Sequence, residues 1–436
     1  MPFVSTRHPA GAPVTLADAI QQGLAPGGGL YVPVEVPVLA AGEFAAWRGR
    51  SLPEVATALL APLVADTFDV PTLGRLMAGA LDFPMPLVPL APDLSVLELF
   101  RGPTLAFKDV GARTMARWLA VVAGAADPRP LTVLVATSGD TGGAVAHAFR
   151  GVGGTRVVVL YPRGRVSPVQ EAQFATLGGN VTAVAVDGVF DDCQRMVKQA
   201  FADAALARAL RLTSANSINI GRLLPQMAYY AWAALQLPAD APPPIIVVPS
   251  GNLGNLTAGV LAQRRGVPIG GFVAATAAND PLPRFLASGR YEPRPSVPTL
   301  ASAMDVGAPS NFERLSWLYR GDVAAMRAAM TWATVTDDDI RAAVRDLADR
   351  FGYLADPHTA VAYLGRPRRG ANGAGAAPTV ILATAHAAKF QEVVEPALAR
   401  AVPLPPALAE RLALPSLVVP AAPTLAALTR VLATLE

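Results

Sequence analysis

From position 94 onward, short apolar runs alternate along the chain with longer amphipathic segments. This alternation is typical of a parallel β-sheet whose strands are connected by helices, because such strands are buried on both faces. We predict strands at 96–100, 131–137, 155–161, 181–186, 245–249, 269–275 and 379–384. We predict helices at 109–123, 141–150, 168–177, 190–210, 221–235, 255–265 and 387–399. The pattern therefore predicts an α/β fold with one or two doubly wound sheets.

The first 92 residues have a different character. They contain short helical patterns at 16–22 and 52–63, and the turn-rich run between these patterns ends in prolines that permit at most an edge strand. The segment 84–92 carries four prolines and indicates a boundary. A chain of 436 residues exceeds one ordinary hydrophobic core. We therefore expect an N-terminal domain at 1–92 and an α/β region at 93–436, with a smaller subdomain at roughly 130–230.

Two strand-to-helix turns carry glycines and small polar residues. The sequence SGDTGG follows the predicted strand 131–137, and SGNLGN follows the predicted strand 245–249. The carboxyl ends of parallel strands are where ligands bind, and the N–H groups of a helix N-terminus favour an anion. One such turn is a common structural feature, but two in one sheet indicate a site for phosphate or carboxylate. Neither turn matches the dinucleotide or P-loop pattern, which argues against NAD and ATP.

Lysine is rare in this chain. Only Lys108, Lys198 and Lys389 occur among 36 basic residues, so arginine serves nearly everywhere as the generic cation. A desolvated lysine can lose its proton and attack a carbonyl carbon, which arginine cannot do. Lys108 follows the apolar residues 105–107, which would disfavour its charged form. The alternative is a surface ion pair with Asp109, and the local sequence leaves both interpretations open.

Other polar clusters are less specific. The run SANSINIGR at 214–222 places Arg222 where it could clamp a phosphate or a carboxylate. Helix capping by Ser217 or Asn219 is the simpler explanation of this polar run. Thr384 is followed by a histidine and by the third lysine at the end of the last predicted strand. His147 lies among alanines inside a predicted helix, so we interpret it as a packed residue.

Composition excludes several classes of function. The net charge of +3 is small for this length, which argues against nucleic acid as a partner. No apolar run is long enough to span a membrane, and the N-terminus lacks a secretion signal. The single cysteine, Cys193, fits the reducing cytoplasm, and no cluster has metal-ligand spacing, so we expect no metal site. The basic, glycine-rich run 365–378 is best interpreted as a surface loop.

Together these motifs resemble the threonine synthases, which are pyridoxal-phosphate enzymes of the tryptophan-synthase-β fold type. The resemblance covers nearly the whole chain and includes GLAPGGGLYVP, GPTLAFKD, ATSGDTGGAVAHAF, NSINIGRLLPQ, VPSGNLGNLTAG, TLASAMDVGAPSN and ATAHAAKF. The order GPTLAFKD, SGDTG, SGNLGN is a specific signal. It implies two α/β domains preceded by an N-terminal domain, with the region 93–436 as the catalytic part.

The resemblance also implies roles for individual residues. The lysine of the LAFKD motif carries pyridoxal phosphate as a Schiff base in this family, which implies Lys108. The cofactor phosphate is held by the glycine loop, which implies Gly251, Asn252, Leu253 and Gly254, followed by Asn255 where many relatives have aspartate. Thr384 is expected to face the pyridine nitrogen, which would leave the cofactor ring unprotonated. Asp140 is expected beside the cofactor ring.

The implied reaction converts O-phospho-L-homoserine and water into L-threonine and phosphate. By similarity, the substrate carboxylate is expected at Ser138, Gly139 and Thr141. The candidates for holding the substrate phosphate are Ser167, Asn219 and Arg222. The implied partners are this small-molecule substrate and at most a second copy of the chain, as a monomer or a homodimer.

Two alternatives remain at this point. Another pyridoxal-phosphate lyase of the same fold, such as a threonine or serine dehydratase or a phospholyase, would share the lysine and the glycine loop. A catalytically silent relative could instead bind a phosphorylated ligand as a sensor, but it would have no need of Lys108. A visible absorbance band that depends on Lys108 would separate an enzyme from a sensor.

Overall fold

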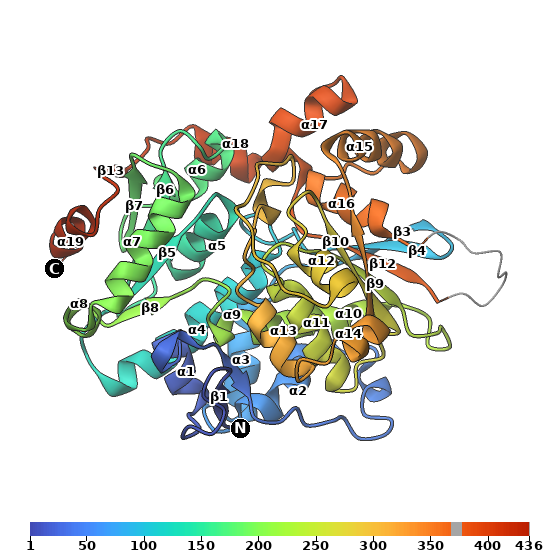
Figure 1. Ribbon diagram of the computed structural model, residues 1–436, viewed down its shortest axis with the longest axis horizontal. Helices are drawn as coiled ribbons and strands as arrows, with labels where there is room; N and C mark the ends of the chain where they lie inside the picture. Colours follow the sequence, from blue (N-terminus) through green and yellow to red (C-terminus); the bar gives the residue numbers. More distant parts are fainter. Residues whose placement is uncertain (368–376, 436) are drawn as a thin grey trace.

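Two separate β-sheets organise the molecule. The computed structural model describes residues 1–367 and 377–435, and the run 365–378 therefore lies largely outside the described residues. The smaller sheet has five strands and the larger has six. In Figure 1 the smaller sheet lies on the left and the larger on the right, and the N-terminal helices lie below both. Helices cover both faces of each sheet, so the expected doubly wound α/β architecture is confirmed.

The larger sheet has the strand order β11-β10-β9-β12-β4-β3. Neighbouring strands are parallel, except that β3 runs antiparallel to β4 at one edge. Its strands span Leu87–Ala91 (β3), Leu94–Glu98 (β4), Ile245–Pro249 (β9), Gly271–Thr276 (β10), Met330–Thr334 (β11) and Thr379–Ala383 (β12). Successive residues of β9 point to opposite faces, so that Ile246 and Val248 enter one apolar cluster and Val247 enters another.

The smaller sheet has the order β13-β7-β6-β5-β8, and all its strands are parallel. Its central strands consist almost entirely of buried residues, which is the pattern that made them recognisable in the sequence. The strands span Leu131–Ala136 (β5), Thr155–Pro162 (β6), Val181–Val186 (β7), Leu212–Ser214 (β8) and Val418–Ala421 (β13).

The helices cover the two faces of each sheet in turn. Around the smaller sheet, α4 (Lys108–Ala126), α5 (Asp140–Phe149), α6 (Pro168–Ala175) and α18 (Pro406–Leu412) form one layer. The opposite layer consists of α7 (Phe190–Ala202), α8 (Ala204–Ala209) and α19 (Leu425–Ala433). Around the larger sheet, one layer consists of α15 (Asp337–Phe351), α16 (Pro357–Gly365) and α17 (Gln391–Leu398).

The opposite side of the larger sheet carries the remaining helices of the α/β region. These are α9 (Ile220–Leu223), η3 (Leu224–Gln226), α10 (Met227–Gln236), α11 (Gly254–Arg264), α12 (Pro281–Ser288), α13 (Phe312–Leu318) and α14 (Val323–Ala329). Two short 3-10 turns, η4 (Ser302–Met304) and η5 (Ala387–Phe390), lie in the long connections.

The N-terminal region packs beneath these helices as a small layer of its own. It contains the antiparallel pair β1 (Phe3–Ser5) and β2 (Tyr31–Pro33), and the helices α1 (Leu16–Gln22), η1 (Pro26–Gly28), η2 (Ala45–Trp47), α2 (Leu52–Val64) and α3 (Val70–Ala80). Helix α2 packs against α10, and α3 packs against α4, so the region shares one hydrophobic core with the α/β part.

Several sequence-based predictions were wrong in detail. The proline-rich segment 84–92 contains the strand β3, which pairs with β4 and was not predicted. The strand β13 near the C-terminus, which pairs with β7 in the smaller sheet, was also not predicted. The predicted helix 190–210 is two helices, because Asp203 ends α7 and caps α8. The segment after Thr384 begins as the 3-10 turn η5 rather than as an α-helix.

No helix in the described part of the chain combines the length and the apolar character that crossing a membrane would require.

Candidate active site

The carboxyl ends of β5, β9 and β12 open into one cavity of about 720 Å³ between the two sheets. Its walls include Lys108 at the start of α4, the turns after β5 and β9, and Thr384 just past the end of β12. The site residues expected from the sequence that line the cavity are Lys108, Ser138, Asp140, Thr141, Arg222, Gly251, Asn252, Leu253, Gly254, Asn255 and Thr384. The two glycine turns were expected in one sheet, but β5 belongs to the smaller sheet and β9 to the larger one. Residues distant in the sequence therefore converge where the carboxyl ends of strands from both sheets meet.

A strained turn delivers Lys108 to this cavity. Leu105 adopts a left-handed backbone conformation with φ 56°, which is unusual for a residue that is not glycine. Ala106 then forms an isolated antiparallel bridge with Ala385, and the Phe107 N–H donates to the Thr384 carbonyl over 2.8 Å. The lysine that begins α4 is thus tied directly to the segment that presents Thr384.

The Lys108 amine lies against the carboxylate of Asp140. The distance from Lys108 Nζ to Asp140 Oδ2 is 3.3 Å, and the lysine side chain is 16% exposed. Burial lowers the pKa of Lys108, and Asp140 opposes this effect, while the positive charges of Lys389 and Arg222 act in the same direction as burial. This environment favours a neutral amine, which is the nucleophilic form of lysine.

Asp140 is itself held by two further groups. The Lys389 ammonium lies 2.6 Å from Asp140 Oδ1, and the side-chain amide of Gln170 donates to the same oxygen over 2.9 Å. Burial alone would raise the pKa of Asp140, but Lys389 and Lys108 hold it far below its usual range. The carboxylate is therefore held in its charged form and contacts both lysines.

The turn after β9 forms a nest of backbone donors. Leu253 has the left-handed φ of 61°, and α11 begins at the next residue. Among the described residues none accepts a hydrogen bond from the N–H groups of Gly251, Asn252 or Leu253. A Cβ at Gly251 would lie 2.7 Å from Met304 Cα, so only glycine permits this close approach. The turn has the donors and the shape that a phosphate requires.

Side chains around this turn hold it in place. Asn252 donates to Ser217 Oγ over 2.6 Å, and its own Oδ1 accepts from the Ser310 N–H over 2.6 Å. Asn255 accepts from the hydroxyls of Tyr229 and Tyr230, whereas its buried Nδ2 has no hydrogen-bond partner among the described residues. That amide is an orphaned donor in the wall of the cavity, and a phosphate oxygen would satisfy it.

The turn after β5 is built in a different way. The Thr137 hydroxyl accepts from the N–H groups of Gly139 and Gly142, which shapes the turn. The N–H groups of Asp140 and Thr141 donate to none of the described residues, as expected for the first turn of α5. Gly139 is at the N-cap, and a Cβ there would lie 2.5 Å from Gln170 Oε1. These donors suit a carboxylate.

The three residues expected at a substrate phosphate are not brought together. Arg222 lines the cavity, is buried, and donates to the Ala215 carbonyl over 2.5 Å, and burial lowers its pKa to about 10. Asn219 is fully buried and caps α9, and its Nδ2 donates to the carbonyls of Ile20 and Ser214. Ser167 caps α6. Neither Asn219 nor Ser167 lines the cavity. Gly139 does not line the cavity either, although it belongs to the turn that does.

Several residues at the cavity were missed by sequence reasoning. The N-terminal region contributes Arg7, Leu24, Gly28 and Leu30, and the long connection after β10 contributes residues 302–308. His358 also lines it and is held by Asp356 over 2.5 Å, while its Nε2 accepts from the Ala303 N–H. The motif TLASAMDVGAPSN was visible in the sequence, but nothing local indicated that it lines the same cavity as Lys108.

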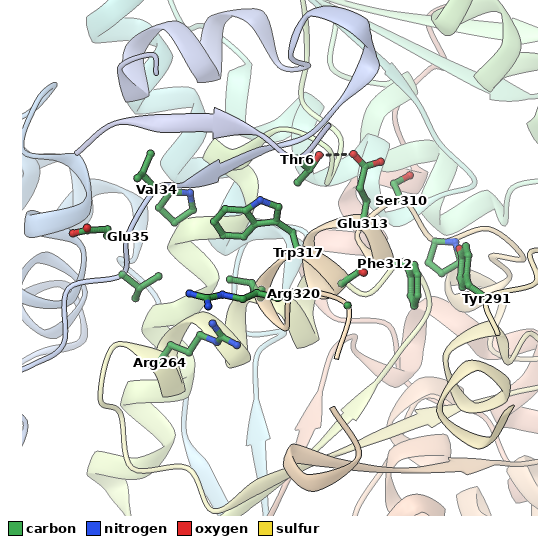
Figure 2. Close-up of a pocket in the computed structure, with 16 residues that line it drawn as sticks. Thr6, Val34, Glu35, Arg264, Tyr291, Ser310, Phe312, Glu313, Trp317 and Arg320 are labelled. Carbon is green, nitrogen blue, oxygen red and sulfur yellow. Dashed lines mark hydrogen bonds between the residues drawn. The ribbon is translucent and has the colours of Figure 1, made fainter. Parts of the chain in front are cut away.

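A second cavity, of about 1110 Å³, lies on the other side of Glu313. Figure 2 shows Trp317 in its centre, Arg264 and Arg320 to one side, and the hydrogen bond from Thr6 to Glu313. Glu313 and Ser310 border both cavities. The second cavity is larger, but the described residues that line it include no lysine, so the chemistry favours the smaller one.

Comparisons with known proteins agree with this geometry. Residues 86–385 match the model of the pyridoxal-phosphate dependent enzymes, residues 2–81 match the threonine synthase N terminus, and residues 359–431 match the threonine synthase C-terminal part. A threonine synthase from Serratia marcescens is 46% identical over 405 residues, which cover 93% of this chain and 92% of that protein. The chain belongs to the threonine synthases.

Solved threonine synthase structures superpose over the full chain. The crystal structure from Escherichia coli has a TM-score of 0.91 at 41% identity and covers 100% of both chains. A pyridoxal-phosphate-bound threonine synthase from Brucella melitensis has a TM-score of 0.92 at 37% identity and covers 100% of this chain and 99% of its own. The protein is therefore a pyridoxal-phosphate-dependent lyase with the function of a threonine synthase, as the motifs predicted.

The residues present fit pyridoxal phosphate. The turn 251–254 supplies unpaired N–H groups with no room for a Cβ, and Asn255 supplies an orphaned buried donor. Lys108 is a desolvated amine, and Thr384 presents a hydroxyl to the same cavity. The cofactor, when bound, supplies an aldehyde for the amine and an aromatic ring that accepts electrons from the substrate.

Proposed function

We propose that this threonine synthase converts O-phospho-L-homoserine and water into L-threonine and inorganic phosphate, with Lys108 as the residue that binds the cofactor and then moves protons. The observation that carries this proposal is the position of Lys108. Its amine is desolvated, lies within reach of Asp140, and faces two separate anion-binding turns across one cavity. A lysine released from the cofactor can act as the base at successive substrate carbons.

The chain offers distinct positions for the anionic groups. The N–H groups of Gly251 to Gly254 and the amide of Asn255 are proposed to bind the cofactor phosphate. The hydroxyl of Thr384 is proposed to face the pyridine nitrogen, with Asp140 holding the lysine end of the cofactor. The turn of Ser138, Asp140 and Thr141 is proposed to bind the substrate carboxylate. This division is supported by the unpaired N–H groups of both turns.

For the leaving phosphate we retain Arg222, because it lines the cavity and its Nε has no hydrogen-bond partner among the described residues. Asn219 and Ser167 are better explained as helix caps, since their polar atoms are used within the fold. Gly139 is proposed to act through the shape of the turn rather than through a contact of its own.

We also propose an N-terminal unit that ends before β3, a smaller unit formed by β5 to β8 with β13, and a larger unit formed by the six-stranded sheet. The strand pairing supports this division, because β3 belongs to the larger sheet and β13 to the smaller. A cytoplasmic location is proposed from the buried, free thiol of Cys193. We propose a monomer or a homodimer.

The decisive experiment compares Lys108→Ala with the control Arg345→Ala, which removes an exposed cation on α15 that does not line the cavity. Purified wild type and Arg345→Ala should carry the visible absorbance of the bound cofactor and release threonine and phosphate in equal amounts from phosphohomoserine. Lys108→Ala should lose both properties. Faster dehydration of threonine or serine than turnover of phosphohomoserine would favour the dehydratase alternative. Cofactor absorbance that survives in Lys108→Ala would refute the assignment of this lysine.

A further inference from the structure

Lys389 is a fully buried lysine in the wall behind the proposed cofactor lysine. Its side chain has no exposed surface, and its ammonium contacts Asp140 Oδ1 at 2.6 Å and the carbonyl oxygen of Thr104 at 2.9 Å. It does not line the cavity, so it is not placed to touch the substrate. The sequence placed it near Thr384, and the structure adds a specific carboxylate partner.

A buried ammonium is costly unless it is paired, and an apolar residue would be the simpler filling for this position. Of the three lysines in the chain, Lys198 is exposed. Lys108 and Lys389 are both largely buried, and both contact the carboxylate of Asp140. Lys108 contacts one oxygen of Asp140 at 3.3 Å, whereas Lys389 contacts the other at 2.6 Å. The shorter and more deeply buried contact is therefore made by Lys389, which does not line the cavity.

The buried charges around Lys108 and Lys389 sum to zero when Lys108 is neutral, with two cations and two carboxylates. Lys389 and Arg222 are the cations that act on Lys108, and Asp140 is the facing carboxylate. Asp109, which Lys389 and Arg113 also influence, is a second buried carboxylate bonded to Thr104. Burial also lowers the pKa of His386, a further titratable neighbour of Lys389, which favours its uncharged form.

Consider the same cluster without Lys389. Asp140 would then have Lys108 as its one cationic contact, and a buried carboxylate binds the charged form of its neighbour strongly. The Lys108 amine would hold its proton to complete that ion pair. With Lys389 in place, a proton on Lys108 would instead add a surplus positive charge to a dry site.

We propose that Lys389 is a positioning residue: its ammonium satisfies the Asp140 carboxylate and thereby leaves Lys108 free to act as a neutral amine. This inference rests on the proposed role of Lys108. The bond to the cofactor forms when the nitrogen lone pair attacks the aldehyde carbon, and both amine hydrogens leave with the aldehyde oxygen as water. A protonated amine has no lone pair for this step.

The test measures how fast cofactor-free, full-length protein captures pyridoxal phosphate between about pH 6 and about pH 9, followed by the rise of visible absorbance. Lys389→Met keeps the length of the side chain and removes its charge. The midpoint is the pH at which the capture rate reaches half of its maximum. In Lys389→Met the capture rate should be reduced by about tenfold or more near neutral pH and should recover as the pH rises. A tenfold reduction corresponds to a rise of about one pH unit in the midpoint. An unchanged midpoint in Lys389→Met would overturn the inference.

Two further variants separate charge from packing. Lys389→Arg keeps a positive charge beside Asp140 and should capture the cofactor with a midpoint close to that of wild type. The double variant Asp140→Asn with Lys389→Met removes the carboxylate that would hold the proton on Lys108, so its midpoint should return toward the wild-type value. If the double variant shifts as far as Lys389→Met alone, the effect is structural and the inference is wrong.

The outcome stays separable from that of the proposed function. Loss of the absorbance in Lys108→Ala together with an unchanged midpoint in Lys389→Met would retain the role of Lys108 and reject that of Lys389. Absorbance that persists in Lys108→Ala would reject both. Unfolding measurements on each variant check that Lys389→Met is folded over the pH range used. If Lys389→Met is not folded, the midpoint of the double variant is compared with that of wild type.

Discussion

The backbone N–H of Phe107 donates a hydrogen bond to the carbonyl oxygen of Thr384 over 2.8 Å. This bond joins the residue before Lys108 to the residue after β12, so the amine and the Thr384 hydroxyl keep a constant relative position. The bridge between Ala106 and Ala385 adds a second tie at the same place. Two groups proposed to contact opposite ends of one cofactor ring system are therefore held by main-chain contacts rather than by flexible side chains.

Thr384→Val removes the hydroxyl and keeps the shape and the main-chain bond to Phe107. We expect cofactor binding to weaken by roughly fivefold, which corresponds to one lost hydrogen bond of about 1 kcal/mol. The visible absorbance should remain, because Lys108 is untouched. Thr384→Ser should bind nearly as wild type does. Equilibrium titration with pyridoxal phosphate measures both, and equal affinities for the valine and serine variants would contradict the role of the hydroxyl.

Gly251→Ala adds a Cβ that would lie 2.7 Å from Met304 Cα. Because the neighbouring atom belongs to the backbone, the turn itself must shift, and such overpacking costs about 1–3 kcal/mol. We expect cofactor affinity to fall by roughly tenfold to hundredfold. Gly153→Ala is the matched control, since nothing lies within 4 Å of its Cβ position. A Gly251→Ala protein with wild-type affinity would exclude this turn as the phosphate site.

Arg314→Met tests the anchor that joins the N-terminal region to the site. The buried guanidinium donates to the carbonyls of Tyr31, Ser217 and Ile218 and to Asn311 Oδ1, and burial lowers its pKa to about 9. Its removal leaves several buried acceptors unpaired, so we expect a loss of about 3–5 kcal/mol in the free energy of unfolding.

The control for this variant is Arg320→Met, where the arginine is exposed. It should change the free energy of unfolding by less than about 0.5 kcal/mol. Urea titrations measure both variants under the same conditions. If the two variants lose the same free energy of unfolding, the hydrogen bonds of Arg314 do not stabilise the fold as expected.

His147 gives stability a dependence on pH. Burial, followed by the charges of Arg113, Arg411 and Arg150, lowers the pKa of His147 to about 4 in the folded protein. The unfolded chain binds a proton near the ordinary value of 6.5, so the folded state loses stability as the pH falls from about 6.5 toward about 4. The stabilising contribution is fully present above that range.

His147→Gln cannot titrate and should not show this loss. The difference in unfolding free energy between wild type and His147→Gln should shift by up to about 3 kcal/mol in favour of the variant between pH 6.5 and pH 4. Chemical unfolding at several pH values gives the comparison. Parallel pH profiles for the two proteins would mean that His147 protonates equally in the folded and unfolded states.

Local patterns accounted for most of the architecture. Strand β5 consists of six buried residues, and that uninterrupted apolar run marked it as a central parallel strand. The turns at 138–143 and 250–255 were recognisable because glycine and small polar residues at a helix N-terminus have a local geometric cause. Strands β8 and β13 were missed because they are short, and β13 pairs with β7 far away in the sequence.

The sequence by itself determined the fold class and the family and singled out Lys108 as the candidate lysine, since periodicity, turn chemistry and motif order are properties of neighbouring residues. Only the tertiary structure decided which groups meet. It turned Asn219 inward as a cap, brought Arg7 and His358 to the cavity, and set Lys389 against Asp140. These outcomes depend on how two sheets and an N-terminal layer pack together. Contacts between residues distant in the chain have no signature in the local pattern that formed each element.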